Sequence, residues 1–166
     1  MADRIVVLNK GRVEQIDSPD ALYDRPASLF ISSFIGHTNL LRGTVTETDR
    51  VQLDSGPEID LGRSAQRRRG TPVTISVRPE NIAFGAAEQP GAIPVTIRTT
   101  VPLGAVSVTE GITASGEAVK ISQARAAGTA QVQTGSTAWF AISDTSRVSI
   151  FSTPVDGVST DQQRSV

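Results

Sequence analysis

The sequence contains no cysteine, one histidine and few aromatic residues, with one Trp, one Tyr and five Phe among 166 residues. Disulfides and thiolate metal sites are therefore excluded, and the single His37 cannot form a histidine-based metal cluster. No apolar run approaches the roughly 18 residues that a transmembrane helix needs, and the N-terminal residues do not resemble a signal peptide. These absences predict a soluble, cytoplasmic protein whose core rests on Val, Ile, Leu and Ala.

An excess of charge is also missing, because 16 Lys and Arg residues face 17 Asp and Glu residues, a formal net charge of -1. Dedicated nucleic-acid binders carry a clear basic excess, so no nucleic-acid partner is expected. The basic cluster Arg67-Arg68-Arg69, with Arg63 nearby, has no interleaved aromatic residues for base stacking. We interpret this cluster as a solvated loop.

The first residues predict a β-hairpin. The run from Ile5 to Leu8 is wholly apolar and rich in β-branched residues, which is typical of a strand covered on both faces. Asn9-Lys10-Gly11 indicates a turn, after which Arg12 to Ile16 can return as a second strand. Two short strands cannot bury both faces unaided. We therefore expect cover from the rest of the chain, from another chain, or from neighbours that this sequence lacks.

Two short helices are predicted next. Ser18-Pro19-Asp20 is a helix start, because serine can cap, proline tolerates the first helical position and aspartate favours the positive end of the dipole. Pro26 ends this helix, since it forces the preceding residue out of helical geometry. A second helix is expected over residues 27–35, with Gly36 as its stop.

From about residue 43 the apolar residues alternate with polar ones, and glycines fill the gaps. This period of two is typical of half-buried β-strands. It is seen at Val45, Val51, Leu53, Val73, Ile75, Val77, Val95, Ile97, Val106, Val108, Val119, Ile121, Phe140, Ile142, Val148 and Ile150. The fold class predicted is therefore mostly β: a small OB-like barrel or sandwich of short antiparallel strands, preceded by the hairpin and the two helices.

Three sequence blocks, in order along the chain, carry a family resemblance. They are Met1 to Gln15; Tyr23, Pro26, Phe34, Gly36 and Asn39; and Val77-Arg78-Pro79-Glu80-Asn81-Ile82 with Leu103-Gly104 further on. Together they resemble the C-terminal part of the ATP-binding subunit of ABC importers. The first block resembles the end of the ATPase core, the second the linker that leaves it, and the third the transport-associated OB (TOBE) regulatory domain. The linker is most similar to the spermidine/putrescine and iron subgroup.

The resemblance implies a division of the chain into three regions. Residues 1–41 would be the remnant of the ATPase core with its linker, residues 42–151 the TOBE domain, and residues 152–166 a flexible tail. No G-x-x-x-x-G-K-[ST] phosphate loop is present in the sequence. This stretch is therefore expected to bind neither ATP nor Mg²⁺, which belong to the full-length parent, and to have no cofactor and no enzymatic activity of its own.

Arg78, Pro79 and Glu80 are the candidate interface residues, because they stand at the end of a strongly alternating strand. Arginine forms bidentate pairs with carboxylates, so Arg78 could hold the regulatory domain against a neighbour or the ATPase core. A strand terminus that ties down a loop explains the same residues. Trp139 is expected to face outward beside core residue Phe140, either as a dimer contact or as a cap on one end of the barrel.

The resemblance implies a regulatory and dimerisation domain of an ABC import system for a small solute, polyamine-like or iron. Its partners would be a second copy, with exchange of the N-terminal segment between the copies as one route, together with the ATPase core and the membrane permease subunits. The location implied is the inner face of the cell membrane. The alternative is a stand-alone OB-like protein that binds an oxyanion or an oligonucleotide. An enzyme is a third reading, but the sequence shows no paired catalytic constellation.

Overall fold

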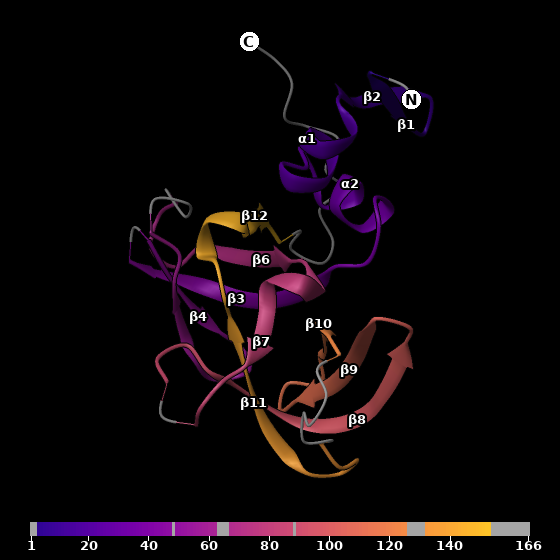
Figure 1. The fold of residues 1–166 in the computed structure, drawn as a ribbon. Helices are drawn as coiled ribbons and strands as arrows, with labels where there is room; N and C mark the ends of the chain where they lie inside the picture. The colour runs from indigo at the N-terminus through magenta and orange to yellow at the C-terminus, as the bar shows by residue number, and fades with distance from the viewer. Residues whose placement is uncertain (1–2, 48, 63–66, 88, 126–131, 154–166) are drawn as a thin grey trace.

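The protein is described by a computed structural model over residues 3–47, 49–62, 67–87, 89–125 and 132–153. Figure 1 shows an N-terminal hairpin and two helices beside a larger body made of strands. We call residues 39–153 the barrel, residues 18–38 the linker, and the two strands before it the N-terminal hairpin. The predicted boundary between residues 41 and 42 falls inside strand β3 (Asn39–Glu47).

The barrel consists of two five-stranded antiparallel sheets. The first sheet has the spatial order β12 (Ser149–Ser152), β6 (Pro72–Val77), β3, β4 (Arg50–Leu53) and β5 (Glu58–Asp60). The second has the order β10 (Ala118–Ala124), β9 (Val106–Thr113), β8 (Ile93–Leu103), β11 (Thr137–Ile142) and β7 (Ile82–Phe84). The predicted mostly-β, OB-like fold is thereby confirmed.

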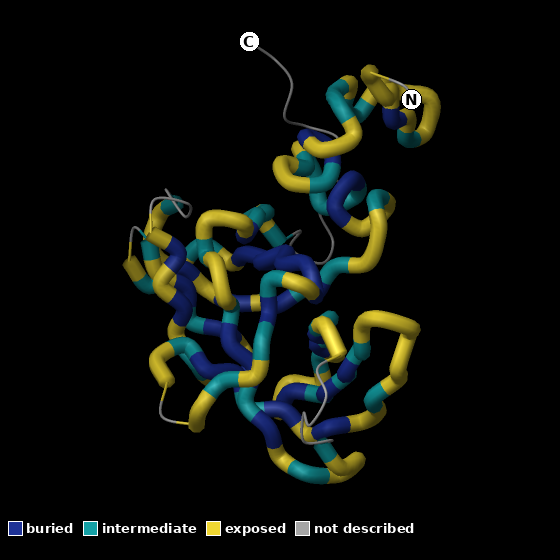
Figure 2. The backbone as a smooth tube through the Cα atoms, in the orientation of Figure 1, coloured by how far each residue is buried: buried dark blue, intermediate teal, exposed yellow. Residues whose placement is uncertain are grey.

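One continuous hydrophobic core lies between the two sheets, and Figure 2 shows it as the buried stretches of the facing strands. Aliphatic residues dominate it, as the low aromatic content predicts, and Phe140 is its one aromatic member among the described residues. Gly111 of β9 leaves room for the side chain of Val95 on the neighbouring strand β8, because a Cβ at position 111 would stand 2.7 Å from the Cβ of Val95. The core residues are Leu41, Val45, Val51, Leu53, Ile59, Leu61, Val73, Ile75, Val77, Ile82, Ile93, Val95, Ile97, Val119, Ile121, Ala138, Phe140 and Val148.

The linker contains α1 (Pro19–Asp24) and α2 (Leu29–Phe34). The predicted start of the first helix is confirmed, since the Ser18 hydroxyl accepts a hydrogen bond from the Ala21 amide. Ser28 caps the second helix in the same way at Ile31. Of this linker, Leu22 and Ile31 form a small second core together with Val7 of the hairpin.

The N-terminal hairpin pairs β1 (Ile5–Asn9) with β2 (Arg12–Asp17) through the predicted turn, where Lys10 and Gly11 both adopt positive φ. Of the three sources of cover considered for its first strand, the described part of this chain does not cover both faces. Only Val7 is buried, whereas Val6 and Leu8 are 53% and 61% exposed. The reason is that one face rests on the small core with the linker helices, and the opposite face meets no other described element.

Strand β6 differs from its prediction as a half-buried strand. Its alternate residues Thr74 and Ser76 are buried as well, with exposed fractions of 6% and 4%. Thr74 lies beside Thr153 after the last strand, and Ser76 lies under the linker. The alternating polar residues of β6 therefore face hydrogen-bonding side chains of the protein and not solvent. The predicted flexible tail begins at residue 152, which ends β12, and residues 154–166 lie outside the described part of the chain.

Candidate functional site

The linker meets the barrel at Arg78, which follows the last residue of β6 and is only 6% exposed. One terminal nitrogen, Nη1, donates to the carbonyl oxygens of Ser32 at 3.0 Å and His37 at 3.1 Å. The other, Nη2, donates to the carbonyl oxygen of Tyr23 at 3.2 Å. The guanidinium carbon also lies 4.1 Å from the centre of the Tyr23 ring, a cation–π contact. A single side chain thus holds three separate points of the linker.

The carboxylate partner that the sequence suggested for Arg78 is not what the structure shows. Arg78 meets backbone carbonyls, and Glu80 accepts a hydrogen bond of 2.6 Å from the hydroxyl of Tyr23. Pro79 begins the short 3-10 turn η2 (Pro79–Asn81). This turn directs both charged neighbours toward the linker, so Tyr23 is held at its ring by one residue and at its hydroxyl by the other.

The surroundings of Tyr23 change the pKa of its hydroxyl. Burial, followed by the hydrogen bond and the negative charge of Glu80, raises the pKa of Tyr23 from 10.0 to about 12. The nearby charge of Arg78 lowers the pKa, but this effect is smaller. The tyrosine is therefore a neutral hydrogen-bond donor throughout the physiological range.

Gly36 and Asn39 complete the attachment. Gly36 ends the linker helices with φ of +84°, and a Cβ there would meet the Tyr23 ring at 3.5 Å. Asn39 is 2% exposed and makes two hydrogen bonds to one residue: its Nδ2 donates to the Lys120 carbonyl at 2.8 Å, and its Oδ1 accepts from the Lys120 amide at 2.7 Å. Since Asn39 begins β3 and Lys120 belongs to β10, this side chain joins the two sheets of the barrel.

A hydroxyl cluster was missed at the sequence level. The Ser76 hydroxyl lies 2.5 Å from that of Ser32 and 2.7 Å from that of Thr38, and the Thr38 hydroxyl reaches the Val77 carbonyl at 3.3 Å. Ser76 occupies the polar phase of an alternating strand, so nothing in the sequence separated it from a solvent-facing residue. These small hydroxyls let the α2 backbone approach β6 closely.

The remaining predicted residues are placed as follows. Pro26 lines a small space beside Tyr23 and Arg78. Phe34 is 64% exposed and stacks on Phe30 with ring centroids 5.5 Å apart, away from the Arg78 contacts. Trp139 lies on β11, half-buried, opposite Pro94 of β8.

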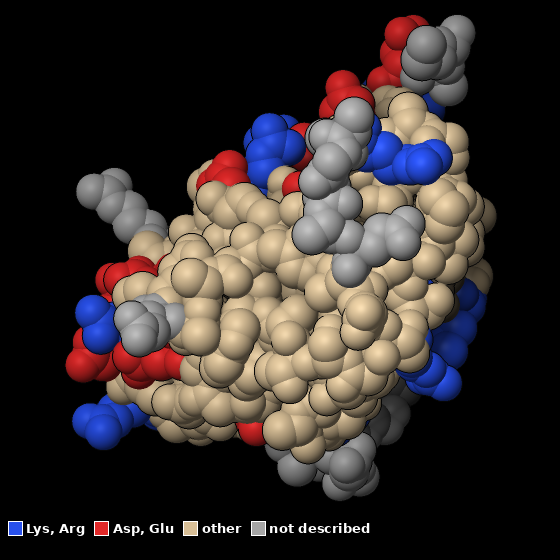
Figure 3. Space-filling view, turned by 60° about the horizontal axis from the view of Figure 1, so that its bottom comes forward, with Lys and Arg blue, Asp and Glu red and all other residues tan. Residues whose placement is uncertain are grey.

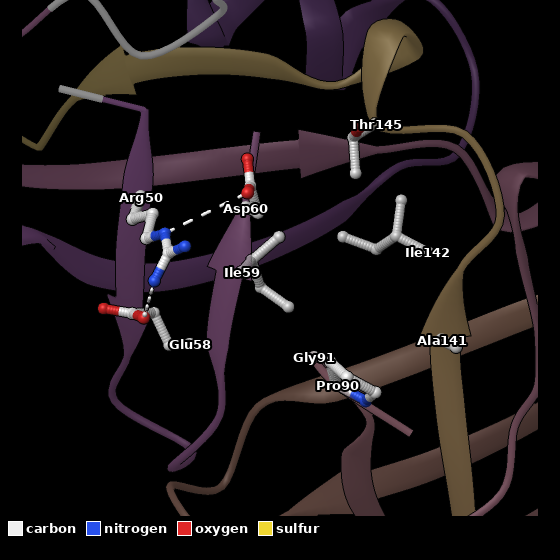
Figure 4. Close-up of a pocket in the computed structure, with 9 residues that line it drawn as sticks. All are labelled: Arg50, Glu58, Ile59, Asp60, Pro90, Gly91, Ala141, Ile142 and Thr145. Atoms are coloured by element: carbon white, nitrogen blue, oxygen red, sulfur yellow. Dashed lines mark hydrogen bonds and ion pairs between the residues drawn. The ribbon is translucent and has the colours of Figure 1, made fainter. Parts of the chain in front are cut away.

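Two larger cavities flank the barrel. One, of about 290 Å³, borders the junction and is lined by Tyr23, His37, Pro79, Glu80, Leu103, Val108, Lys120 and Ser122. The other, of about 280 Å³, combines an apolar floor with a charged rim, as Figure 4 shows. At this rim Arg50 pairs with Glu58 at 3.4 Å and with Asp60 at 3.9 Å.

The charges beside these cavities are already paired. Lys120 lies 3.3 Å from Glu110, and Arg50 has the carboxylates just described. Within the described ranges, no cluster of three His, Asp or Glu residues is arranged to hold a metal ion. No helix of the described part is long and apolar enough to cross a membrane. The geometry of this region is thus that of a contact that joins elements.

Comparisons with known proteins agree with this description. Residues 75–148 match the model of the TOBE domain. The chain is 38% identical over 114 residues to the sn-glycerol-3-phosphate import ATP-binding protein UgpC of Salmonella paratyphi A, and 39% identical over 114 residues to that of Escherichia coli K12. Each match covers 67% of this chain and 32% of the relative. The chain therefore spans about a third of the length of the curated relatives that it matches.

Among solved structures, the chain is similar to the cytoplasmic molybdate-binding protein ModG with molybdate bound. The TM-score is 0.53 with 17% sequence identity, and the match covers 68% of this chain and 94% of ModG. This similarity shows a shared fold. The resemblance to ABC importer ATP-binding subunits is thus supported, whereas the spermidine/putrescine or iron subgroup is a wrong prediction, because the relatives are named for import of sn-glycerol-3-phosphate.

Proposed function

We propose that this chain is the regulatory and pairing module of the ATP-binding subunit of an ABC importer for a small solute. It would act at the inner face of the cell membrane, together with an ATPase core and permease subunits. It contributes neither ATP binding nor hydrolysis. Two observations support this proposal: the match of residues 75–148 to the TOBE domain, and the similarity to importer ATP-binding proteins over 67% of the chain.

The observation that carries the mechanism is the set of Arg78 contacts. Because Arg78 holds the linker at Tyr23, Ser32 and His37, a displacement of the linker carries the barrel with it. The second attachment at Asn39 extends this coupling to the other sheet. Pairing of two barrels would then keep two attached ATPase cores at high effective concentration while their nucleotide interface opens and closes.

A chimera tests this function. The aligned region of UgpC from E. coli K12 is replaced by that of this chain, and uptake of sn-glycerol-3-phosphate is measured in cells that depend on it. We expect uptake to persist in the chimera. We expect Arg78→Met to lower it, because the linker is released. Arg147→Met is the control for loss of an exposed linker contact: its ion pairs with Asp24 of α1 and with Asp144 lie at the surface and contribute little, so uptake should stay unchanged.

The protein level in each strain is the control, measured by immunoblot of membrane fractions. A chimera that reaches the wild-type level in membranes and gives no uptake contradicts the proposal. So does an Arg78→Met chimera that transports as well as the Arg147→Met chimera. ATP hydrolysis above the blank by the purified chain would contradict the assignment as a module without catalysis.

The second candidate is a stand-alone oxyanion-binding protein, favoured by the fold shared with molybdate-bound ModG. The charges argue against it, because Lys120 and Arg50 at the two cavities already face carboxylates. Arg67 of the basic cluster is likewise engaged, donating to Ser152 Oγ at 2.7 Å and to the Ile150 carbonyl at 3.0 Å. Calorimetric titration with molybdate and tungstate decides between the two, since micromolar binding would favour this second candidate.

A further inference from the structure

The cavity of about 290 Å³ at the linker–barrel junction has two walls, and we call it the junction cavity. One wall comes from the linker and from the turn η2, through Tyr23, Pro79 and Glu80. The other wall comes from β8, β9 and β10 of the second sheet. Pockets of about 300–1,000 Å³ take drug-sized molecules, so the junction cavity has room for one small metabolite.

The strand register shows what the second wall presents. The residues of β10 that alternate with Lys120 and Ser122 belong to the core, so these two side chains point out of the barrel. Ser122 pairs with Val108 of β9, which therefore lies beside it on the same face. Leu103 lies at the end of β8 and is 57% exposed. This wall is thus apolar along the β8–β9 hairpin and polar along β10.

The lining also contains one acidic and one basic residue, Glu80 and Lys120. Lys120 lies 3.3 Å from Glu110, but Glu110 also lies 3.9 Å from Arg98, so one carboxylate serves two cations. Glu80 accepts its hydrogen bond from the neutral hydroxyl of Tyr23 and keeps its negative charge. An ammonium group donates three hydrogen bonds and a carboxylate accepts several, so each group has capacity for a ligand.

Three other classes of ligand match this lining less well. A compact oxyanion has no apolar part for Leu103 and Val108, and it is repelled by the carboxylate of Glu80. A hydrophobic amine offers nothing to Lys120, and a hydrophobic acid offers nothing to Glu80. A nucleic acid needs a continuous basic surface, whereas Figure 3 shows Lys and Arg side chains in separate groups at the edges of a broad face.

We propose that the junction cavity binds a free α-amino acid with an apolar side chain. Glu80 binds the ammonium group of the ligand, and Lys120 and the hydroxyl of Ser122 bind its carboxylate. The side chain of the ligand packs on Leu103 and Val108. A free amino acid carries both charges on one carbon atom, so a cavity of this size can satisfy both at once.

A bound amino acid would contact the linker and the second sheet together, because Tyr23 belongs to the first wall and β10 to the second. Its concentration would therefore set how firmly the linker is held against the barrel. The binding site itself depends only on the lining of the junction cavity. It does not depend on the importer assignment.

The test is a titration of the isotope-labelled full chain with L-leucine, followed by NMR of the backbone amides. We expect saturable shifts at His37, Glu80 and Ser122, with a dissociation constant on the order of 1 mM. The amide of Val51 in the other sheet should not shift. Isocaproate lacks the ammonium group of leucine and isopentylamine lacks its carboxylate, so each should bind at least about tenfold more weakly.

Matched variants assign the separate contacts. Lys120→Met should weaken leucine about tenfold and leave isopentylamine unchanged, since that probe has no carboxylate. Glu80→Gln should weaken leucine and leave isocaproate unchanged, and the glutamine carbonyl still accepts from Tyr23. Leu103→Ser should weaken all three probes. Val101→Ser is its control, because Val101 is a 43% exposed residue of the same strand outside the lining.

Each result supports or overturns the proposal, once circular dichroism has shown that the variants are folded. Wild type without saturable shifts up to about 50 mM leucine overturns the site. Shifts that spare His37, Glu80 and Ser122 also overturn it. Isocaproate or isopentylamine that binds as tightly as leucine overturns the ligand class, and equal effects of Leu103→Ser and Val101→Ser overturn the apolar wall. Uptake by the chimera tests the proposed function separately.

Discussion

Replacing Arg78 with methionine removes the side chain that attaches the linker to the barrel. Three carbonyl oxygens, those of Tyr23, Ser32 and His37, lose a charged donor at 3.0–3.2 Å. A hydrogen bond to a charged group contributes about 1.5–3 kcal/mol, but release of a buried guanidinium to an apolar residue recovers part of its desolvation cost. We expect a net loss of about 3–5 kcal/mol for Arg78→Met. Arg78→Lys should lose about 2 kcal/mol, because one ammonium cannot reach all three carbonyls.

Hydrogen exchange locates this loss. The amides of Arg25 and Ile35, which donate within the linker to Ala21 and Ile31, should lose at least two orders of magnitude of protection in Arg78→Met. Amides in the barrel core should lose less, since the barrel keeps its own hydrophobic contacts. Arg147→Met is the control and should change neither set. Linker amides as protected as in wild type would refute the attachment role of Arg78, and uniform loss across linker and barrel would show that the residue supports the whole fold instead.

Three further predictions concern single residues. Tyr23 is the only tyrosine, so absorbance at 295 nm should titrate with a pKa of about 12 in the folded protein and near 10.0 in urea. Because the folded pKa is raised, the contribution of Tyr23 to the free energy of unfolding is fully present below pH 10 and is lost as the pH rises toward 12. Asn39→Ala removes the side-chain partner of the part-buried amide and carbonyl of Lys120 and should cost about 2–4 kcal/mol in urea unfolding. A loss under about 1 kcal/mol would show that water replaces the asparagine amide. The hydroxyl of Ser55 is buried and has no hydrogen-bond partner among the residues that the structure describes. Ser55→Ala should therefore leave the stability within about 0.5 kcal/mol of wild type or raise it, and a clear decrease would be contrary evidence.

Local patterns predicted the elements of this fold well. The alternation at Val45, Val51 and Leu53 indicated β-strands, and Ser18 indicated a helix start, because both signals depend on nearest neighbours along the chain. The same pattern misled at Thr74 and Ser76. A buried hydroxyl and an exposed one look alike in a sequence when their partners lie more than 40 residues away.

The candidate site was predictable in part of its membership and not in its contacts. The resemblance selected Tyr23, Gly36, Asn39, Arg78 and Glu80, and the structure brings these five together at the linker–barrel junction. Which partner each one takes depends on tertiary approach. A carboxylate was the natural expectation for Arg78, but backbone carbonyls at the ends of two short helices are equally good acceptors once the fold places them within reach.

The side-chain amide of Asn39 bridges β3 and β10 by hydrogen bonds, although these strands belong to different sheets. The hydrogen bonds of Asn39 therefore join β3 to β10 and hold the end of the linker at the same time, so the two contacts form and break together. A binding partner that stabilises the β3–β10 contact must also stabilise the linker against the barrel. By linkage, a displacement of the linker weakens the β3–β10 contact by the same free energy. Coupling between the linker and β10 then requires no moving domain, only this shared residue.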